Sequence, residues 1–253
     1  MEEVVLCFSL KYNGDFNSIY KAISNKEPKT KEEFTVLLNK LDTEYISIFS
    51  DKYPDKFKSM NRPPFVLYYK GEFDLLSKDC VSLIGKVNES GIDNIDIVLK
   101  DILKYDLVPV LLSQDDSEKQ LIEKLNDLCV PTVVIVENGI TKCLRDDARL
   151  QKVLDNGGLV LSEIPFETDK RMPQFIAAKL SVALADEVVV LQTDLEEKGS
   201  FILYDLIDQN KLYSVVASKK ESELKHCDAL IALGADQFES VEKVKYRIQK
   251  RKE

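Results

Sequence analysis

Several glycines, hydroxyl groups and lysines in this sequence stand where the chain leaves an apolar run or enters a helical stretch. Glycine turns and helix N-termini present backbone N–H groups to phosphate, and lysine adds positive charge. We therefore predict a phosphate-binding site. Its candidate residues are Gly85, Lys86, Ser113, Lys179, Lys198, Gly199 and Ser200.

The other reactive residue types suggest neither a metal site nor a nucleophile with its base. The chain has a single histidine, His226, and none of its five cysteines belongs to a C-x-x-C pair. Structural zinc sites need four Cys or His ligands at characteristic spacings. We expect reduced thiols, no metal, no cofactor and no enzymatic activity. The cysteines are Cys7, Cys80, Cys129, Cys143 and Cys227.

The net charge of −9 argues against a general nucleic-acid binder, because phosphate contacts need a basic surface. Bulk charge does not exclude a local basic pocket. The tail from 241 to 253 is rich in lysine and arginine, which leaves two interpretations open. It is either a solvated helical end or a weak phosphate-contacting tail.

Short, continuously apolar runs alternate with amphipathic stretches of helical length along most of the chain. This pattern is typical of an α/β protein with a doubly wound, Rossmann-like and mostly parallel sheet joined by right-handed crossovers. The expected core strands are 81–84, 108–112, 132–136, 158–161, 188–191 and 213–217. The expected helices are 95–105, 118–128, 148–156, 173–185 and 201–209. Two further strands are expected at 45–49 and 65–69.

The organisation that we predict has three parts. Residues 1–42 form a small helical N-terminal domain, residues 43–240 form the Rossmann-like domain, and residues 241–253 form a charged C-terminal helix. Acidic residues follow Met1 where a signal peptide carries basic ones, and no apolar run approaches the roughly 20 residues of a membrane helix. We expect a cytoplasmic protein without a membrane partner.

The order of several motifs resembles the DNA-processing protein A (DprA/Smf) family over about residues 44–238. The segments that carry the resemblance are 51–54, 62–71, 81–85, 156–165, 179–186, 198–200 and 230–235. The resemblance implies an extended Rossmann domain behind a small helical domain. It also implies a non-catalytic homodimer that binds single-stranded DNA and helps to load the recombinase RecA onto it.

The chain departs from the family pattern where phosphate would bind. Val87 stands at the family's arginine, with Lys86 one place earlier, and 113–118 replaces a glycine-rich turn with acids. We read that turn as an ordinary helix cap by Ser113 or Asp115. The segment 175–179 keeps one lysine, Lys179, of a run with several arginines. The prediction is weakened single-strand binding with a shallow salt dependence.

Two alternatives remain open from the sequence. The first is an interaction protein that has kept the fold and the dimer surface but has lost DNA binding. The second is a nucleotide-binding Rossmann protein, some of whose relatives cleave nucleoside monophosphates. Release of adenine from AMP would test the second alternative.

Overall fold

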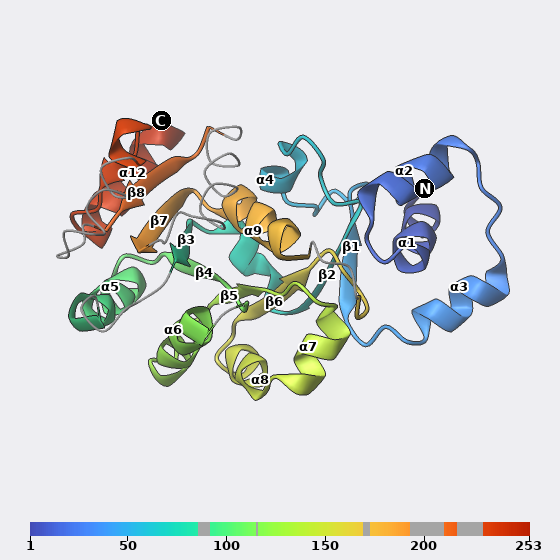
Figure 1. Ribbon diagram of the computed structural model, residues 1–253, viewed down its shortest axis with the longest axis horizontal. Coiled ribbons are helices and arrows are strands. Elements are labelled where there is room, and N and C mark those ends of the chain that lie inside the picture. The colour runs from blue at the N-terminus through green and yellow to red at the C-terminus, as the bar shows by residue number, and fades with distance from the viewer. Residues whose placement is uncertain (86–91, 115, 169–172, 193–209, 217–229) are drawn as a thin grey trace.

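The protein is described by a computed structural model that covers residues 1–85, 92–114, 116–168, 173–192, 210–216 and 230–253. Within these ranges, one nine-stranded sheet runs through the molecule and helices cover both of its faces (Figure 1). The strands are β1 (Glu44–Ser47), β2 (Val66–Gly71), β3 (Cys80–Gly85), β4 (Val108–Leu112), β5 (Val133–Ile135), β6 (Leu159–Ser162), β7 (Glu187–Gln192), β8 (Leu212–Val215) and β9 (Asp236–Gln237).

The helices fall into an N-terminal group, a group between the core strands, and one helix at the C-terminal end. The N-terminal group is α1 (Glu2–Lys11), α2 (Phe16–Ser24) and α3 (Lys31–Leu38), followed by α4 (Asp55–Lys58) and the 3-10 helix η1 (Phe73–Ser77). The rest are α5 (Ile92–Lys104), α6 (Asp116–Asp127), α7 (Ile140–Asp146), α8 (Ala148–Asp155), α9 (Pro173–Leu184) and α12 (Val241–Lys252).

The strand order, β1-β2-β6-β5-β4-β3-β7-β8-β9, confirms the predicted doubly wound, mostly parallel sheet. The first core strand, β3, pairs in parallel with both β4 and β7. The chain therefore builds β4, β5 and β6 on one side of β3 and then returns to place β7 on the other. In such a sheet, ligands bind outside the carboxyl ends of the strands, where the strand order reverses. Among the strands of the described ranges, only β1–β2 and β2–β6 pair antiparallel.

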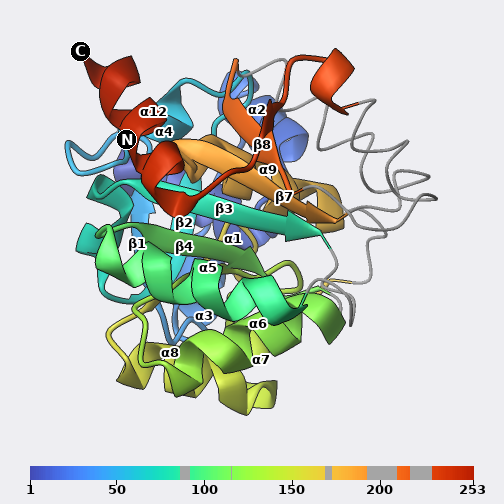
Figure 2. The ribbon, with the colours of Figure 1, turned by 90° about the vertical axis from the view of Figure 1, so that its left-hand side faces the viewer.

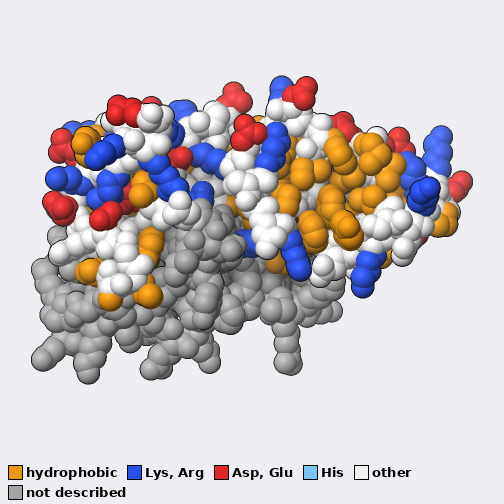
Figure 3. Space-filling view, turned by 90° about the horizontal axis from the view of Figure 1, so that it is seen from above, with side chains coloured by type: hydrophobic (Ala, Val, Ile, Leu, Met, Phe, Trp, Pro, Cys, Tyr) orange, Lys and Arg blue, Asp and Glu red, His pale blue; other side chains and the backbone are white. Residues whose placement is uncertain are grey.

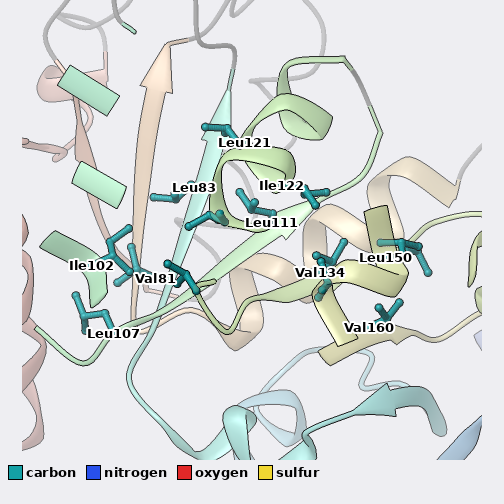
Figure 4. Packing of buried hydrophobic residues seen from close by; sticks show 14 of the residues in the cluster. Val81, Leu83, Ile102, Leu107, Leu111, Leu121, Ile122, Val134, Leu150 and Val160 are labelled. Carbon is teal, nitrogen blue, oxygen red and sulfur yellow. The ribbon is translucent and has the colours of Figure 1, made fainter. Parts of the chain in front are cut away.

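Each face of the sheet has its own apolar layer, because alternate residues of a strand point to opposite faces. On one face Val81, Leu83 and Leu111 pack against α5 and α6, as Figure 4 shows. On the other face the neighbouring strand positions pack against α9 and α4, with Phe57 fully buried. Small residues let α9 lie close to the sheet, where the buried hydroxyls of Ser181 and Ser82 are 2.6 Å apart.

Most expected elements are present with boundaries shifted by a few residues. The helix expected at 201–209 lies outside the described residues. The sequence patterns did not predict α4, α7 or the two-residue strand β9, because elements this short carry too little periodicity to be recognised. No helix in the described part of the chain combines the length and the apolar character needed to cross a membrane.

The N-terminal helices share a core with the sheet. Leu6 and Leu10 of α1 belong to the same buried cluster as Val66 and Tyr68 of β2. The buried Tyr68 hydroxyl also bonds the Ser9 hydroxyl at 2.8 Å. The division into three domains stays a prediction, and these contacts join its first two parts.

Candidate functional site

Three of the candidate residues lie at or near one edge of the sheet. Gly85 ends β3, Ser113 directly follows β4, and Lys179 lies in the second turn of α9. The arrowheads of β3 and β7 mark this carboxyl edge in Figure 2. The other candidates, Lys86, Lys198, Gly199 and Ser200, lie outside the described residues. Gly85 thus ends one strand and Ser113 follows the neighbouring strand.

Gly85 sits where the pairing between β3 and β7 becomes irregular. The register shifts between Ile84 and Gly85, which lies opposite Gln192. Its φ is +112°, a backbone angle that favours glycine over residues with a Cβ. The backbone at this strand end therefore favours glycine.

In the turn after β4, a carboxylate of the protein itself accepts a backbone hydrogen bond. The backbone N–H of Gln114 donates to a carboxylate oxygen of Glu118 at 2.7 Å, and the Glu118 side chain is buried. Glu118 lies in the first turn of α6 and reaches back, as the acid of a capping box does. The expectation of an ordinary cap by Ser113 or Asp115 missed this carboxylate, and Asp115 itself lies outside the described residues. Here Glu118 accepts an N–H that a glycine-rich turn could offer to phosphate.

Lys179 shares its surroundings with Glu163, an acid that was not among the predicted site residues. Burial raises the pKa of Glu163, directly after β6, to about 8, and the negative charge of Asp15 acts in the same direction. The positive charge of Lys179 opposes the rise but does not cancel it. Glu163 is therefore mostly protonated at neutral pH, which leaves the charge of Lys179 available to another anion.

The turn between α1 and α2 docks onto the segment that contains Glu163. The side-chain amide of Asn13 exchanges two 3.0 Å hydrogen bonds with the backbone of Phe166. The next residue, Gly14, has a φ of +78°, and a Cβ there would lie 2.3 Å from the carbonyl oxygen of Glu163. This close approach brings Asp15 towards Glu163.

Replacing Gly14 with alanine should therefore separate the helical turn from the end of β6. We expect a loss of about 2–4 kcal/mol in unfolding free energy, from backbone strain plus the displaced contact. Gly157→Ala is the matched control, because its φ is +73° but nothing lies within 4 Å of the added Cβ. Urea denaturation of both variants measures the difference. Equal losses of unfolding free energy in the two variants would show that the contact with Glu163 contributes nothing to stability.

Metal ligands and thiols are the other reactive groups to consider in the described residues. None of them form a group of three or more His, Cys, Asp or Glu side chains that could hold a metal ion. Cys7 and Cys80 are buried free thiols, Cys143 is half-buried and Cys129 is exposed. Desolvation raises the pKa of Cys80 to about 11, so this thiol stays protonated and unreactive at neutral pH.

Comparison with known proteins agrees with this architecture. Residues 44–112, from β1 to the end of β4, match the family model of DNA recombination-mediator protein A. No curated protein sequence shows significant similarity to the chain. The chain is similar in structure to DNA processing protein A from Streptococcus pneumoniae, with a TM-score of 0.74 and 19% identity. That alignment covers 96% of this chain and 92% of the other.

A second similar structure is DNA processing protein A from Helicobacter pylori, which was studied for its single-stranded DNA binding mode. The TM-score is 0.69 at 18% identity, over 83% of this chain and 98% of the other. Identities this low establish a shared fold alone. Residues 44–112 thus match the DNA recombination-mediator protein A family model, and the chain as a whole shares the fold of two DNA processing protein A structures.

Proposed function

We propose that the chain binds single-stranded DNA at the carboxyl edge of its sheet, with lower affinity than a DprA protein that keeps the full arginine set. The observation that carries this proposal is the shared fold with DprA proteins, one of which binds single-stranded DNA. Non-catalytic action as a homodimer and help in loading RecA belong to the same proposal and come from the family resemblance alone. The cytoplasmic location is proposed from the sequence pattern.

Each candidate residue has a defined part in the proposed contact. The backbone at Gly85, Ser113 and Gly199 and the hydroxyl of Ser200 offer donors to phosphate oxygens. The three ammonium groups of Lys86, Lys179 and Lys198 supply the charge. Lysine makes a point-charge contact without the two-pronged geometry of arginine, so each contact is weaker than the one it replaces. The Glu118 carboxylate after β4 weakens binding further by repelling phosphate.

Reversing two of these charges should remove most of the binding. We expect Lys86→Glu with Lys179→Glu to weaken the affinity for an oligo-dT strand at least about 10-fold at low salt. Fluorescence anisotropy measures this affinity. Lys152→Glu paired with Lys70→Glu is the control, since it makes the same charge change at exposed lysines of α8 and β2.

The salt dependence gives a second, independent measurement. Three lysine contacts predict a slope of log affinity against log salt no steeper than about −2 for a single strand. A slope near zero, or equal affinities for the double variant and its control, would contradict binding at this edge.

A fold-retaining interaction protein is the second candidate function. The internal hydrogen bond from Gln114 to Glu118 favours it, because the turn after β4 is already occupied by an acid. Immobilised RecA should then capture the chain while oligo-dT at low salt does not bind. Capture by RecA together with saturable DNA binding would instead select the first function.

A further inference from the structure

A basic pocket lies at the amino edge of the sheet, on the opposite side from the proposed DNA site. It is formed where β7 and β8 begin, where α9 ends, and where α12 crosses towards α4. Its volume is about 260 Å³. Figure 3 shows lysine and arginine side chains gathered at the end of the molecule that carries α12. The side chains that matter here are Lys56, Asp186, Lys211, Ile248, Arg251 and Lys252.

The lysines in and beside this pocket outnumber the carboxylates that pair with them. Lys56 Nζ lies 2.7 Å from an Asp186 oxygen, and Lys252 Nζ lies 3.8 Å from the other Asp186 oxygen. Lys252 also pairs with Asp79, which already holds Lys245 at 2.8 Å. Three ammonium groups are thus held by two carboxylates.

Two further cations have no carboxylate at all within ion-pair distance in the described part of the chain. Lys211 Nζ donates instead to the carbonyl oxygens of Ala183 and Ala185, at 2.7 and 2.8 Å. Arg251 donates to the carbonyl oxygen of Asn210. With these two, four cations and one carboxylate, that of Asp186, line the pocket, an excess of positive charge in a chain whose net charge is −9.

The pocket is built by packed elements, so its cations are held in place. The apolar side of α12, with Val241, Val244 and Ile248, is buried in the core. The interpretation of residues 241–253 as a merely solvated end is therefore incomplete. Two carbonyl groups at the end of α9 hold the ammonium of Lys211, since they have no partner within the helix. Packing thus brings the C-terminal end of α12 and the side chain of Lys211 together at this pocket.

We propose that this pocket binds the phosphate group of a small anionic ligand. The guanidinium of Arg251 offers a planar pair of N–H donors that matches two phosphate oxygens, and Lys211 and Lys252 add charge. A water molecule occupies about 30 Å³ in the liquid, so the cavity has room for a phosphate and part of the group that carries it. Ile248 and Ala185 supply an apolar wall for that group.

The test uses the whole chain and three probes at low ionic strength: inorganic phosphate, AMP and sulfate. Isothermal titration should detect phosphate or AMP at millimolar concentration or below, and Arg251→Gln should weaken binding about 10-fold. Lys250→Gln is the matched control, because it removes an exposed charge one position away, outside the pocket. Lys211→Met should also weaken binding.

A stability measurement separates loss of the site from loss of the fold. A ligand that binds only the native state raises the melting temperature. Phosphate should therefore raise the melting temperature of the wild type and Lys250→Gln, and raise that of Arg251→Gln much less. No heat and no melting shift with about 10 mM phosphate or AMP, or identical behaviour of the two variants, would overturn the proposal.

Sulfate allows the pH dependence of binding to be measured, since it does not change its own charge between pH 6 and pH 10. Burial lowers the pKa of Lys211 to about 8, the positive charges of Lys56 and Arg251 act in the same direction, and Asp186 and Cys80 oppose them. Sulfate affinity should fall as the pH rises through 8, and Lys211→Met should remove this fall. The same pH profile in both proteins would contradict a role for Lys211.

Oligo-dT distinguishes a free phosphate compound from a DNA backbone phosphate. If the oligonucleotide does not displace AMP, and Arg251→Gln leaves oligo-dT affinity unchanged, the ligand is a small phosphate compound. Displacement of AMP, with weaker oligo-dT binding in Arg251→Gln, would extend the DNA contact to this edge. Either result is independent of Lys86 and Lys179, so the pocket and the proposed function can fail separately.

Discussion

Replacing Arg247 with leucine should cost about 3–5 kcal/mol of unfolding free energy, because it leaves a buried carboxylate without its counter-charge. Glu187 is fully buried at the start of β7. It accepts hydrogen bonds from the guanidinium of Arg247, with the Nε donor at 3.0 Å, and from the Ser214 hydroxyl at 2.7 Å. After the substitution Ser214 is the one hydrogen-bond partner left among the described residues, and one hydroxyl does not replace the solvation that the carboxylate lost.

Urea denaturation followed by circular dichroism measures this loss. The control is Arg145→Leu, whose partner is the adjacent, exposed Asp146 and whose loss should cost less than about 1 kcal/mol. The double variant Glu187→Met with Arg247→Met should recover most of the stability, because no buried charge is left unpaired. A loss below about 1 kcal/mol in Arg247→Leu would show that water reaches Glu187.

Replacing Glu163 with glutamine should make the protein more stable at alkaline pH. The folded-state pKa of about 8 lies above the ordinary value of 4.5, so the unfolded chain releases this proton first. The wild type therefore loses unfolding free energy as the pH rises from about 4.5 to 8. Glutamine has no proton to release, and we expect it to gain about 2 kcal/mol at pH 8.5, a figure reduced because the side chain is partly exposed.

The measurement is the urea midpoint between pH 5 and pH 9. Glu167→Gln is the matched control, because Glu167 is an exposed acid four residues later that pairs with Lys142. Above pH 8 the ionised Glu163 should also neutralise Lys179. Oligo-dT affinity of the wild type should then fall in that range and the affinity of Glu163→Gln should not. Parallel stability profiles of wild type and Glu163→Gln would show that the carboxyl is hydrated.

The sequence alone predicted the class of fold and most of its elements. Runs such as 81–84 and 108–112 and the amphipathic stretch 118–128 carry their periodicity within a few consecutive residues. Such patterns report on whether a segment is covered on one side or on both. The position of Gly85 and Ser113 at strand ends followed directly, because parallel strands end at the same edge.

The tertiary structure decided what depends on residues far apart in the chain. The burial of Glu163 beside Lys179 arises because the turn at Asn13 packs against the end of β6. The amino-edge pocket joins Lys56, Lys211 and Arg251, which stand in three separate segments. Local patterns show which face of a segment is covered but not by which other segment. Burial, pKa shifts and shared counter-ions depend on that packing, so they became visible only in the folded chain.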